Sequence, residues 1–169
     1  MTTRLWQWAG AGLALAATLV WAEDTLGWHS DCGSVKDWYT KNEDPSFQAK
    51  LDPAEPGVLK LTQEGTDTWG KAAFVVKDVD LDKTPILEVK VNKVDKDAAY
   101  KVGVAPLDWS ELFVVVPRSS ADGVSSGNIK TATGWSGKKS FNVVLIVEGK
   151  SKAVWFDDIK IKNAAPTAK

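Results

Sequence analysis

The stretch AVWFDDIKIK, residues 153–162, decides the fold expected for this chain. Successive residues alternate between two faces, and one face carries Trp155, Asp157, Ile159 and Ile161. A period of two is typical of a half-buried β-strand. Asp157 lies in phase with the apolar face, where an unpaired charge is costly. We therefore expect it to accept hydrogen bonds from backbone N–H groups, to bind a cation or to lie at the rim.

Short apolar segments separated by turn residues continue this pattern along the chain. Strands are expected at residues 47–51, 58–63, 69–77, 85–93, 99–105, 111–116, 128–132, 140–147 and 153–162. No segment after residue 24 shows a helical period, and Pro, Gly and Asp fill the gaps between the segments. We therefore predict an all-β fold over residues 25–162, an antiparallel jelly-roll β-sandwich of about nine strands. The polar stretch 117–127 is expected to be a surface loop, and residues 163–169 a flexible tail.

The first 24 residues have the pattern of an export signal, because a short, positively charged start precedes an uncharged run from Leu5 to Ala22. The segment is expected to be either a cleaved signal peptide or one uncleaved N-terminal hydrophobic helix. In the second case Trp6, Trp8 and Trp21 would lie at the two membrane interfaces. Either outcome exports the domain. It would be anchored on the periplasmic side of the inner membrane if the segment is retained, and periplasmic or secreted otherwise.

Composition excludes several classes of function. The formal net charge of -1 gives no electrostatic surface for nucleic acid. One cysteine, Cys32, and one histidine, His29, exclude a disulfide within the chain and a metal site built from several histidines or cysteines. No nucleophile motif or distinct pair of catalytic acids is present, so we expect no enzymatic activity.

Three groups of residues resemble the galactose-binding-like jelly rolls, which include many carbohydrate-binding modules of exported bacterial proteins. These groups are Trp28, Gly33 and Trp38 at the start, Trp69-Gly70 with Asp80-Leu81-Asp82 and Pro85 in the middle, and residues 156–161 at the end. In that family the aspartate of the last strand often helps to hold a structural calcium ion. The resemblance thus implies a calcium site at Asp157, with Asp31 or Asp158. Calcium would neutralise an inward carboxylate. The alternative is that Asp157 accepts backbone hydrogen bonds at the end of a strand.

Family members that bind sugars present aromatic rings to the apolar faces of the sugar units. Trp109 and Trp135 lie among turn-forming residues and are the candidates for ligand or partner contact, together with Trp69. An exposed tryptophan often marks a contact surface. For each of the three, a ring folded over the end of the core is the alternative, and the partner could be a protein.

The favoured interpretation is a non-catalytic, membrane-tethered accessory subunit that docks on the periplasmic side of a membrane protein complex, for example a photosynthetic or respiratory one. The reason is that a single domain joined to an uncleaved N-terminal helix resembles an accessory subunit. The alternative is a free or enzyme-associated periplasmic or secreted glycan-binding protein. The sequence identifies neither a partner complex nor a sugar.

Overall fold

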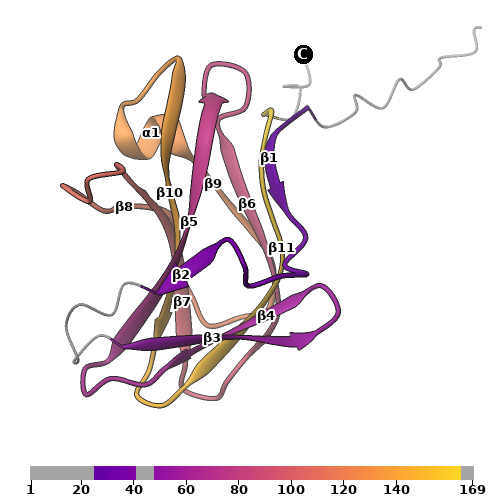
Figure 1. Ribbon diagram of the computed structural model, residues 1–169, viewed down its shortest axis with the longest axis vertical. Coiled ribbons are helices and arrows are strands. Elements are labelled where there is room, and N and C mark those ends of the chain that lie inside the picture. The colour runs from indigo at the N-terminus through magenta and orange to yellow at the C-terminus, as the bar shows by residue number, and fades with distance from the viewer. Residues whose placement is uncertain (1–24, 41–47, 165–169) are drawn as a thin grey trace, which may run out of the picture.

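A computed structural model of the chain describes residues 25–40 and 48–164. The predicted signal or anchor helix with Trp6, Trp8 and Trp21, and all but the first two residues of the predicted tail, lie outside the described residues. Two antiparallel sheets pack against each other, which confirms the predicted β-sandwich (Figure 1). Within the described ranges, no helix is long and apolar enough to cross a membrane.

The first sheet has six strands and the second has five. In spatial order, the six-stranded sheet consists of β3 (Ala49–Glu55), β4 (Val58–Gln63), β11 (Ala153–Lys162), β6 (Ile86–Val94) and β9 (Gly123–Asn128), with β1 (Leu26–Ser30) also paired to β11. The five-stranded sheet consists of β2 (Trp38–Thr40), β5 (Trp69–Asp80), β10 (Lys138–Glu148), β7 (Ala99–Ala105) and β8 (Phe113–Ser119). One short helix, α1 (Ile129–Thr133), joins β9 to β10.

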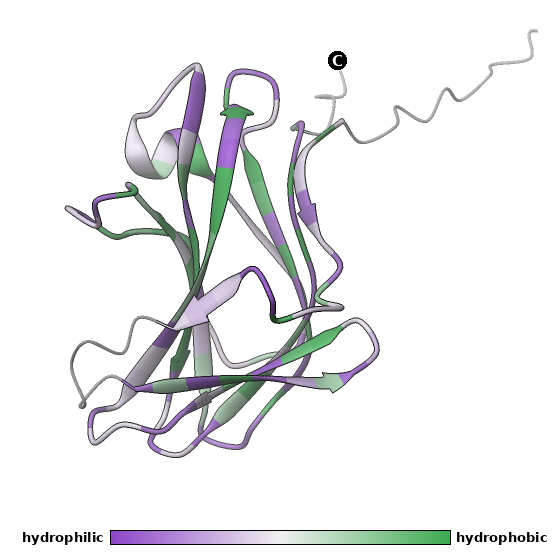
Figure 2. Cartoon of the chain, viewed as in Figure 1, coloured by the Kyte–Doolittle hydropathy of each residue, from purple (hydrophilic) through white to green (hydrophobic). Residues whose placement is uncertain are grey.

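The core lies between the two sheets. Alternate residues of β10 point into it, namely Phe141, Val143, Leu145 and Val147. They are joined from β7 by Tyr100, whose ring meets Phe156 of β11 edge to face at a centroid distance of 5.9 Å. The buried Tyr100 hydroxyl lies 3.0 Å from Ser125 Oγ, so its polar end is paired. Hydrophobic colour follows the strands, whereas the connecting turns are mostly hydrophilic (Figure 2).

Residues 117–127 do not form the predicted loop. β8 continues to Ser119, and β9 begins at Gly123 and pairs with β6 along its whole length. β9 has a polar sequence because it lies at the edge of its sheet, where backbone pairing with β6 holds it without an apolar face. Gly127 is required at its position, since an added Cβ would lie 1.9 Å from the Val115 carbonyl oxygen.

One further predicted strand is wrong, and two further strands were not predicted. The strand expected at residues 128–132 is largely the helix α1, in which Asn128 Oδ1 accepts a hydrogen bond from Thr131 N and Gly134 closes the C-terminus in the left-handed region. One helical turn is too short to show a period. Strands β1, β2 and β9 were not expected, and with the eight confirmed strands they make eleven in the described residues, against about nine predicted.

β11 changes phase in the middle, which the alternation of its sequence does not indicate. Two irregularities in its pairing with β6 flank Phe156. Phe156 is therefore buried in the core before the irregularity and Ile159 after it, while Trp155 is only half-buried. The expectation that Trp155 and Asp157 share the apolar face of the strand is wrong, because a β-bulge lets two consecutive residues avoid the core.

Candidate ligand-binding face

A second buried apolar cluster lies on the outer side of the five-stranded sheet, away from the main core. Its members are the outward-pointing residues Ala73, Ala105, Val144 and Ile146. Their neighbours along the same strands point inward, so the two clusters are separated by the thickness of the sheet. Trp69 and Trp109 pack on this second cluster and cover it in part.

The floor of this outer face is made of small side chains. In register across the sheet, Ala73 of β5 lies beside Val144 of β10, which lies beside Gly103 of β7. Val114 of β8 follows next and is 45% exposed. A Cβ added to Gly103 would lie 2.5 Å from the Phe113 carbonyl oxygen, so glycine lets β8 approach closely here. A low floor between larger side chains leaves room for a ligand.

Trp69 and Trp109 reach this face from different parts of the chain. Trp69 is the first residue of β5, and Trp109 lies in the connection between β7 and β8. The Lys71 ammonium lies over both indole rings, 4.8 Å from the centroid of Trp69 and 5.7 Å from that of Trp109. Trp109 has a φ of 59°, in the left-handed region that side chains other than glycine rarely adopt. Strain of this kind concentrates at functional sites.

A polar network holds the Trp109 ring in place. Its indole Nε1 donates to the Tyr39 hydroxyl at 3.2 Å, and that hydroxyl donates to Asn142 Oδ1 at 2.7 Å. Asn142 is almost fully buried, and its Nδ2 donates to the Pro106 carbonyl oxygen at 2.9 Å, in the same connection that carries Trp109. The rings of Tyr39 and Trp109 meet edge to face at 6.3 Å. The ring is therefore fixed before any ligand arrives.

Next to Trp69 the face contains a small cavity of about 190 Å³. It is lined by Trp69, Lys101, Leu112, Val114, Ile146 and Glu148. The Glu148 carboxylate is bound by two cations, with Lys101 Nζ at 2.5 Å and Arg118 Nε at 2.7 Å. Partial burial raises the pKa of Glu148, but the hydrogen bonds from Lys101 and Arg118 outweigh it and hold the pKa below its ordinary value. The cavity thus has the Trp69 ring on one side and, beside it, the charged cluster of Glu148, Lys101 and Arg118, which we call the ionic rim.

Trp135 belongs to a different part of the surface. Its half-buried ring packs against the core, 5.4 Å from the Phe113 ring and 5.6 Å from the Phe141 ring. A separate cavity of about 210 Å³ borders it, lined by Pro106, Trp135, Lys139 and Ser140. The structure thus brings together Trp69 and Trp109 of the three candidate tryptophans, and it leaves Trp135 at the core.

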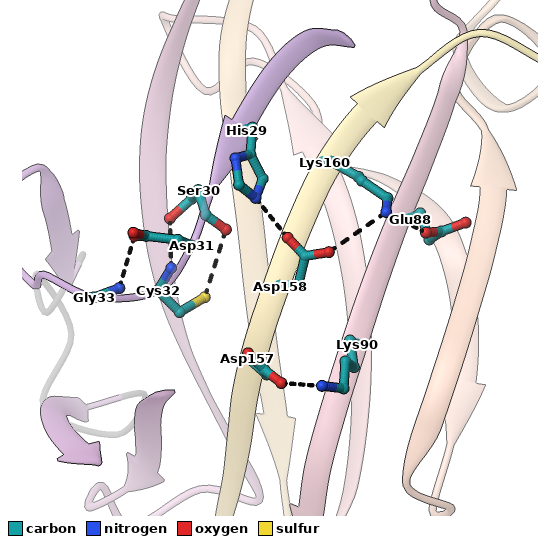
Figure 3. Close-up of polar contacts among 10 residues, drawn as sticks. All are labelled: His29, Ser30, Asp31, Cys32, Gly33, Glu88, Lys90, Asp157, Asp158 and Lys160. Atoms are coloured by element: carbon teal, nitrogen blue, oxygen red, sulfur yellow. Dashed lines mark hydrogen bonds and ion pairs between the residues drawn. The ribbon is translucent and has the colours of Figure 1, made fainter. Parts of the chain in front are cut away.

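The three carboxylates considered for calcium have separate partners (Figure 3). Asp31 accepts a hydrogen bond from Gly33 N at 2.9 Å, and Asp157 pairs with Lys90. Asp158 lies 2.6 Å from Nε2 of His29 and 3.5 Å from Nζ of Lys160. Within residues 25–40 and 48–164 no group of three or more His, Cys, Asp or Glu side chains could hold a metal ion. The calcium site at Asp157 with Asp31 or Asp158 stays a prediction.

Sequence reasoning missed several residues of the candidate face, among them Tyr39, Asn142, Arg118 and Glu148. One signal for Asn142 was present, because it is the single polar residue in the otherwise apolar run FNVVLIV at 141–147. An isolated polar residue in a buried strand needs a hydrogen-bond partner. For the others, the pairing of the strands had to be known first.

The sequence matches no family model and no curated protein sequence. Among solved structures, part of PfGH50B is similar, over 76% of this chain and 22% of the PfGH50B chain, with 10% identity and a TM-score of 0.51. The mannan-recognising carbohydrate-binding module TmCBM27 is similar over 85% of this chain and 100% of its own, with 14% identity and a TM-score of 0.48. The family 11 carbohydrate-binding module of the cellulosomal cellulase Lic26A-Cel5E of Clostridium thermocellum is similar over 86% of this chain and 98% of its own, with 11% identity and a TM-score of 0.48.

Identities this low concern the fold and leave the function to the site itself. The two antiparallel sheets agree with the architecture expected from the strand pattern. The chain therefore has the jelly-roll β-sandwich fold that the strand pattern predicts.

Proposed function

We propose that this domain is a non-catalytic glycan-binding module whose ligand lies on the outer face of the five-stranded sheet. The observation that carries the proposal is the joint presence of Trp69 and Trp109 on that face, beside a cavity of about 190 Å³. The fold alone would not support it, because one sandwich architecture serves many functions.

The chemistry of the face suits a sugar. A pyranose ring has apolar C–H faces and a polar edge, so it needs a flat aromatic surface and a few hydrogen-bonding groups at fixed positions. Trp69 and Trp109 supply the rings, and Glu148, Lys101 and the Tyr39 hydroxyl supply polar groups. Because the network around Asn142 already fixes Trp109, binding would cost little ordering of that side chain.

The sequence favoured an accessory subunit of a membrane complex, with glycan binding as the alternative. The first choice depended on a retained helix within residues 1–24, which lie outside the described residues. The paired tryptophans favour glycan binding, because Trp69 lines a cavity and a hydrogen bond to Tyr39 holds Trp109 on the same face. An exported location, expected from the same N-terminal segment, would give the module access to polysaccharides.

Affinity electrophoresis of the full chain through gels that contain mannan, β-glucan, xylan or acidic polysaccharides tests the proposal. Trp69→Ala and Trp109→Ala are compared with Trp155→Ala, whose ring lies on the opposite sheet beside Lys60 and Lys93. We expect retardation by at least one polymer. Loss of a central aromatic contact costs about 2 kcal/mol, so either site variant should bind roughly 30-fold more weakly. If no polymer retards the chain, or if Trp155→Ala weakens binding as much as the site variants do, glycan binding at this face is wrong.

A further inference from the structure

We infer that the proposed binding face selects glycans that carry acidic groups, either carboxylates or sulfate esters, and that Arg118 is the residue that recognises them. The inference rests on the proposed function and specifies the class of ligand. It is drawn from the ionic rim of the cavity next to Trp69.

The charges around this cavity do not cancel. One carboxylate, that of Glu148, is shared by Lys101 and Arg118, which leaves an excess of one positive charge in the cluster. A ligand with its own negative charges would balance this excess, and a neutral polymer would leave it uncompensated.

The geometry of Arg118 leaves donors for such a ligand. The hydrogen bond to Glu148 uses Nε, and the structure records no bond from its two terminal nitrogens to the described residues. The side chain is 61% exposed, so these nitrogens are accessible to a ligand. A guanidinium presents parallel N–H groups that match the two oxygens of a carboxylate or a sulfate. Glu148 acts as a positioning residue, because it holds the guanidinium at the edge of the cavity.

The cavity is bordered both by an aromatic ring and by charged side chains. Trp69 forms one of its walls, and Lys101 and Glu148 line it as well. A sugar ring placed against Trp69 would therefore direct a substituent toward the Lys101 ammonium and the Arg118 guanidinium that Glu148 holds. A hexuronic acid carries its charge on such a substituent, outside the ring.

The Glu148 carboxylate of this cluster keeps its charge below its ordinary pKa. Although partial burial raises the pKa of Glu148, the hydrogen bonds from Lys101 and Arg118 hold it below the ordinary value. The carboxylate therefore stays ionised at neutral and mildly acidic pH. Recognition of an acidic polymer would then follow the ionisation of the ligand rather than that of the protein.

Polymers that differ only in charge provide the test. Binding of the full chain is measured by affinity electrophoresis and calorimetry against polygalacturonate and its methyl-esterified form, and against a sulfated galactan and its desulfated form. We expect binding to at least one acidic polymer to be about tenfold tighter than to its neutral counterpart at low salt, as a charge-assisted hydrogen bond predicts. Which pair shows the preference distinguishes carboxylate from sulfate recognition.

Three variants separate recognition by Arg118 from general attraction to a polyanion. Arg118→Gln should remove the preference for the acidic polymer, and Arg118→Lys should retain part of it. Lys93→Gln, on the opposite sheet, removes the same charge and should change nothing. Thermal unfolding of each variant checks that it is folded.

The outcomes distinguish this inference from the proposed function. If neutral and acidic polymers bind equally and Trp69→Ala weakens both, the module binds glycans and the inference about acidic groups is wrong. If Lys93→Gln reduces binding as much as Arg118→Gln does, the attraction is general and the assignment of Arg118 fails. If no polymer binds at all, the proposed function fails first.

Discussion

Replacing Asn142 by leucine tests whether a buried polar network shapes the binding face. Asn142 is 1% exposed and links the Tyr39 hydroxyl, at 2.7 Å, to the Pro106 carbonyl oxygen, at 2.9 Å. Leucine has a similar volume and can make neither hydrogen bond. The substitution therefore removes the support of Trp109 without opening a large cavity in the outer apolar cluster.

The expected loss of stability follows from the two hydrogen bonds. Each contributes about 0.5–1.5 kcal/mol net, so we expect a loss of roughly 1–3 kcal/mol. The Pro106 carbonyl oxygen keeps the hydrogen bond that it accepts from Trp109 N at 3.0 Å. In a chain of this length each kcal/mol lowers Tm by about 2–4 °C, which places the decrease at roughly 2–12 °C. Because Tyr39 is partly exposed, water can satisfy its hydroxyl, and the cost falls mainly on the connection that carries Trp109.

Calorimetry of Asn142→Leu and of the control Asn92→Leu, at an exposed position of β6, measures this difference. Tyr39→Phe provides a second test, since it keeps the ring and removes both hydrogen bonds of the hydroxyl. If the network positions Trp109, both Asn142→Leu and Tyr39→Phe should weaken glycan binding by roughly fivefold, equivalent to about 1 kcal/mol. A Tm of Asn142→Leu within about 1 °C of the parent, with unchanged affinity, would refute the reasoning.

Three further predictions concern charged and titratable groups. In Glu88 and Glu148, hydrogen bonds from basic side chains outweigh the effect of burial and hold the folded-state pKa below the ordinary 4.5. The stability that these two carboxylates contribute is thus fully present above pH 4.5 and is lost as the pH falls through the lower, folded-state pKa. In Glu88→Gln and in Glu148→Gln, Tm should therefore fall less steeply between neutral and acidic pH than in the parent. Burial and, to a lesser extent, nearby carboxylates raise the pKa of the Cys32 thiol to about 12 despite a hydrogen bond with Ser30, so a thiol reagent should label it only after unfolding. A chelator should leave Tm unchanged, because Asp157 already has a cationic partner; a decrease that calcium reverses would instead support a calcium site.

Much of the fold could be predicted because most strands bury alternate apolar residues. The segment at β6 follows this rule, whereas β5, β7 and β10 carry buried residues on both faces; the predicted positions of all four agree closely with the structure. The rule fails for β9, whose polar sequence is held by backbone pairing with β6. It also fails for β1 and β2, which are short and whose residues are largely exposed or half-buried.

The candidate face could be predicted only in part. Aromatic side chains among turn residues indicated Trp69 and Trp109, but the same argument selected Trp135, which packs on the core. What separates them is strand register, because β5 and β7 both pair with β10 and place Trp69 and the Trp109 connection on one side of the sheet. The strands that pair here are far apart in the sequence, and the alternation within one strand does not tell which strand it pairs with.

The irregular pairing of β11 determines how the tryptophans are divided between the two outer faces. With strict alternation, Trp155 would point into the core. The bulge next to Phe156 places the Trp155 ring on the outer side of the six-stranded sheet instead, where the ammonium groups of Lys60 and Lys93 lie 5.2 and 4.2 Å from its centroid. Trp155 and the pair Trp69 and Trp109 are thus half-buried tryptophans with lysine contacts on opposite sheets. If glycan binding responds to the pair and not to Trp155, the cause must be the cavity and the fixed ring of Trp109, because an aromatic ring beside a lysine is common to both faces.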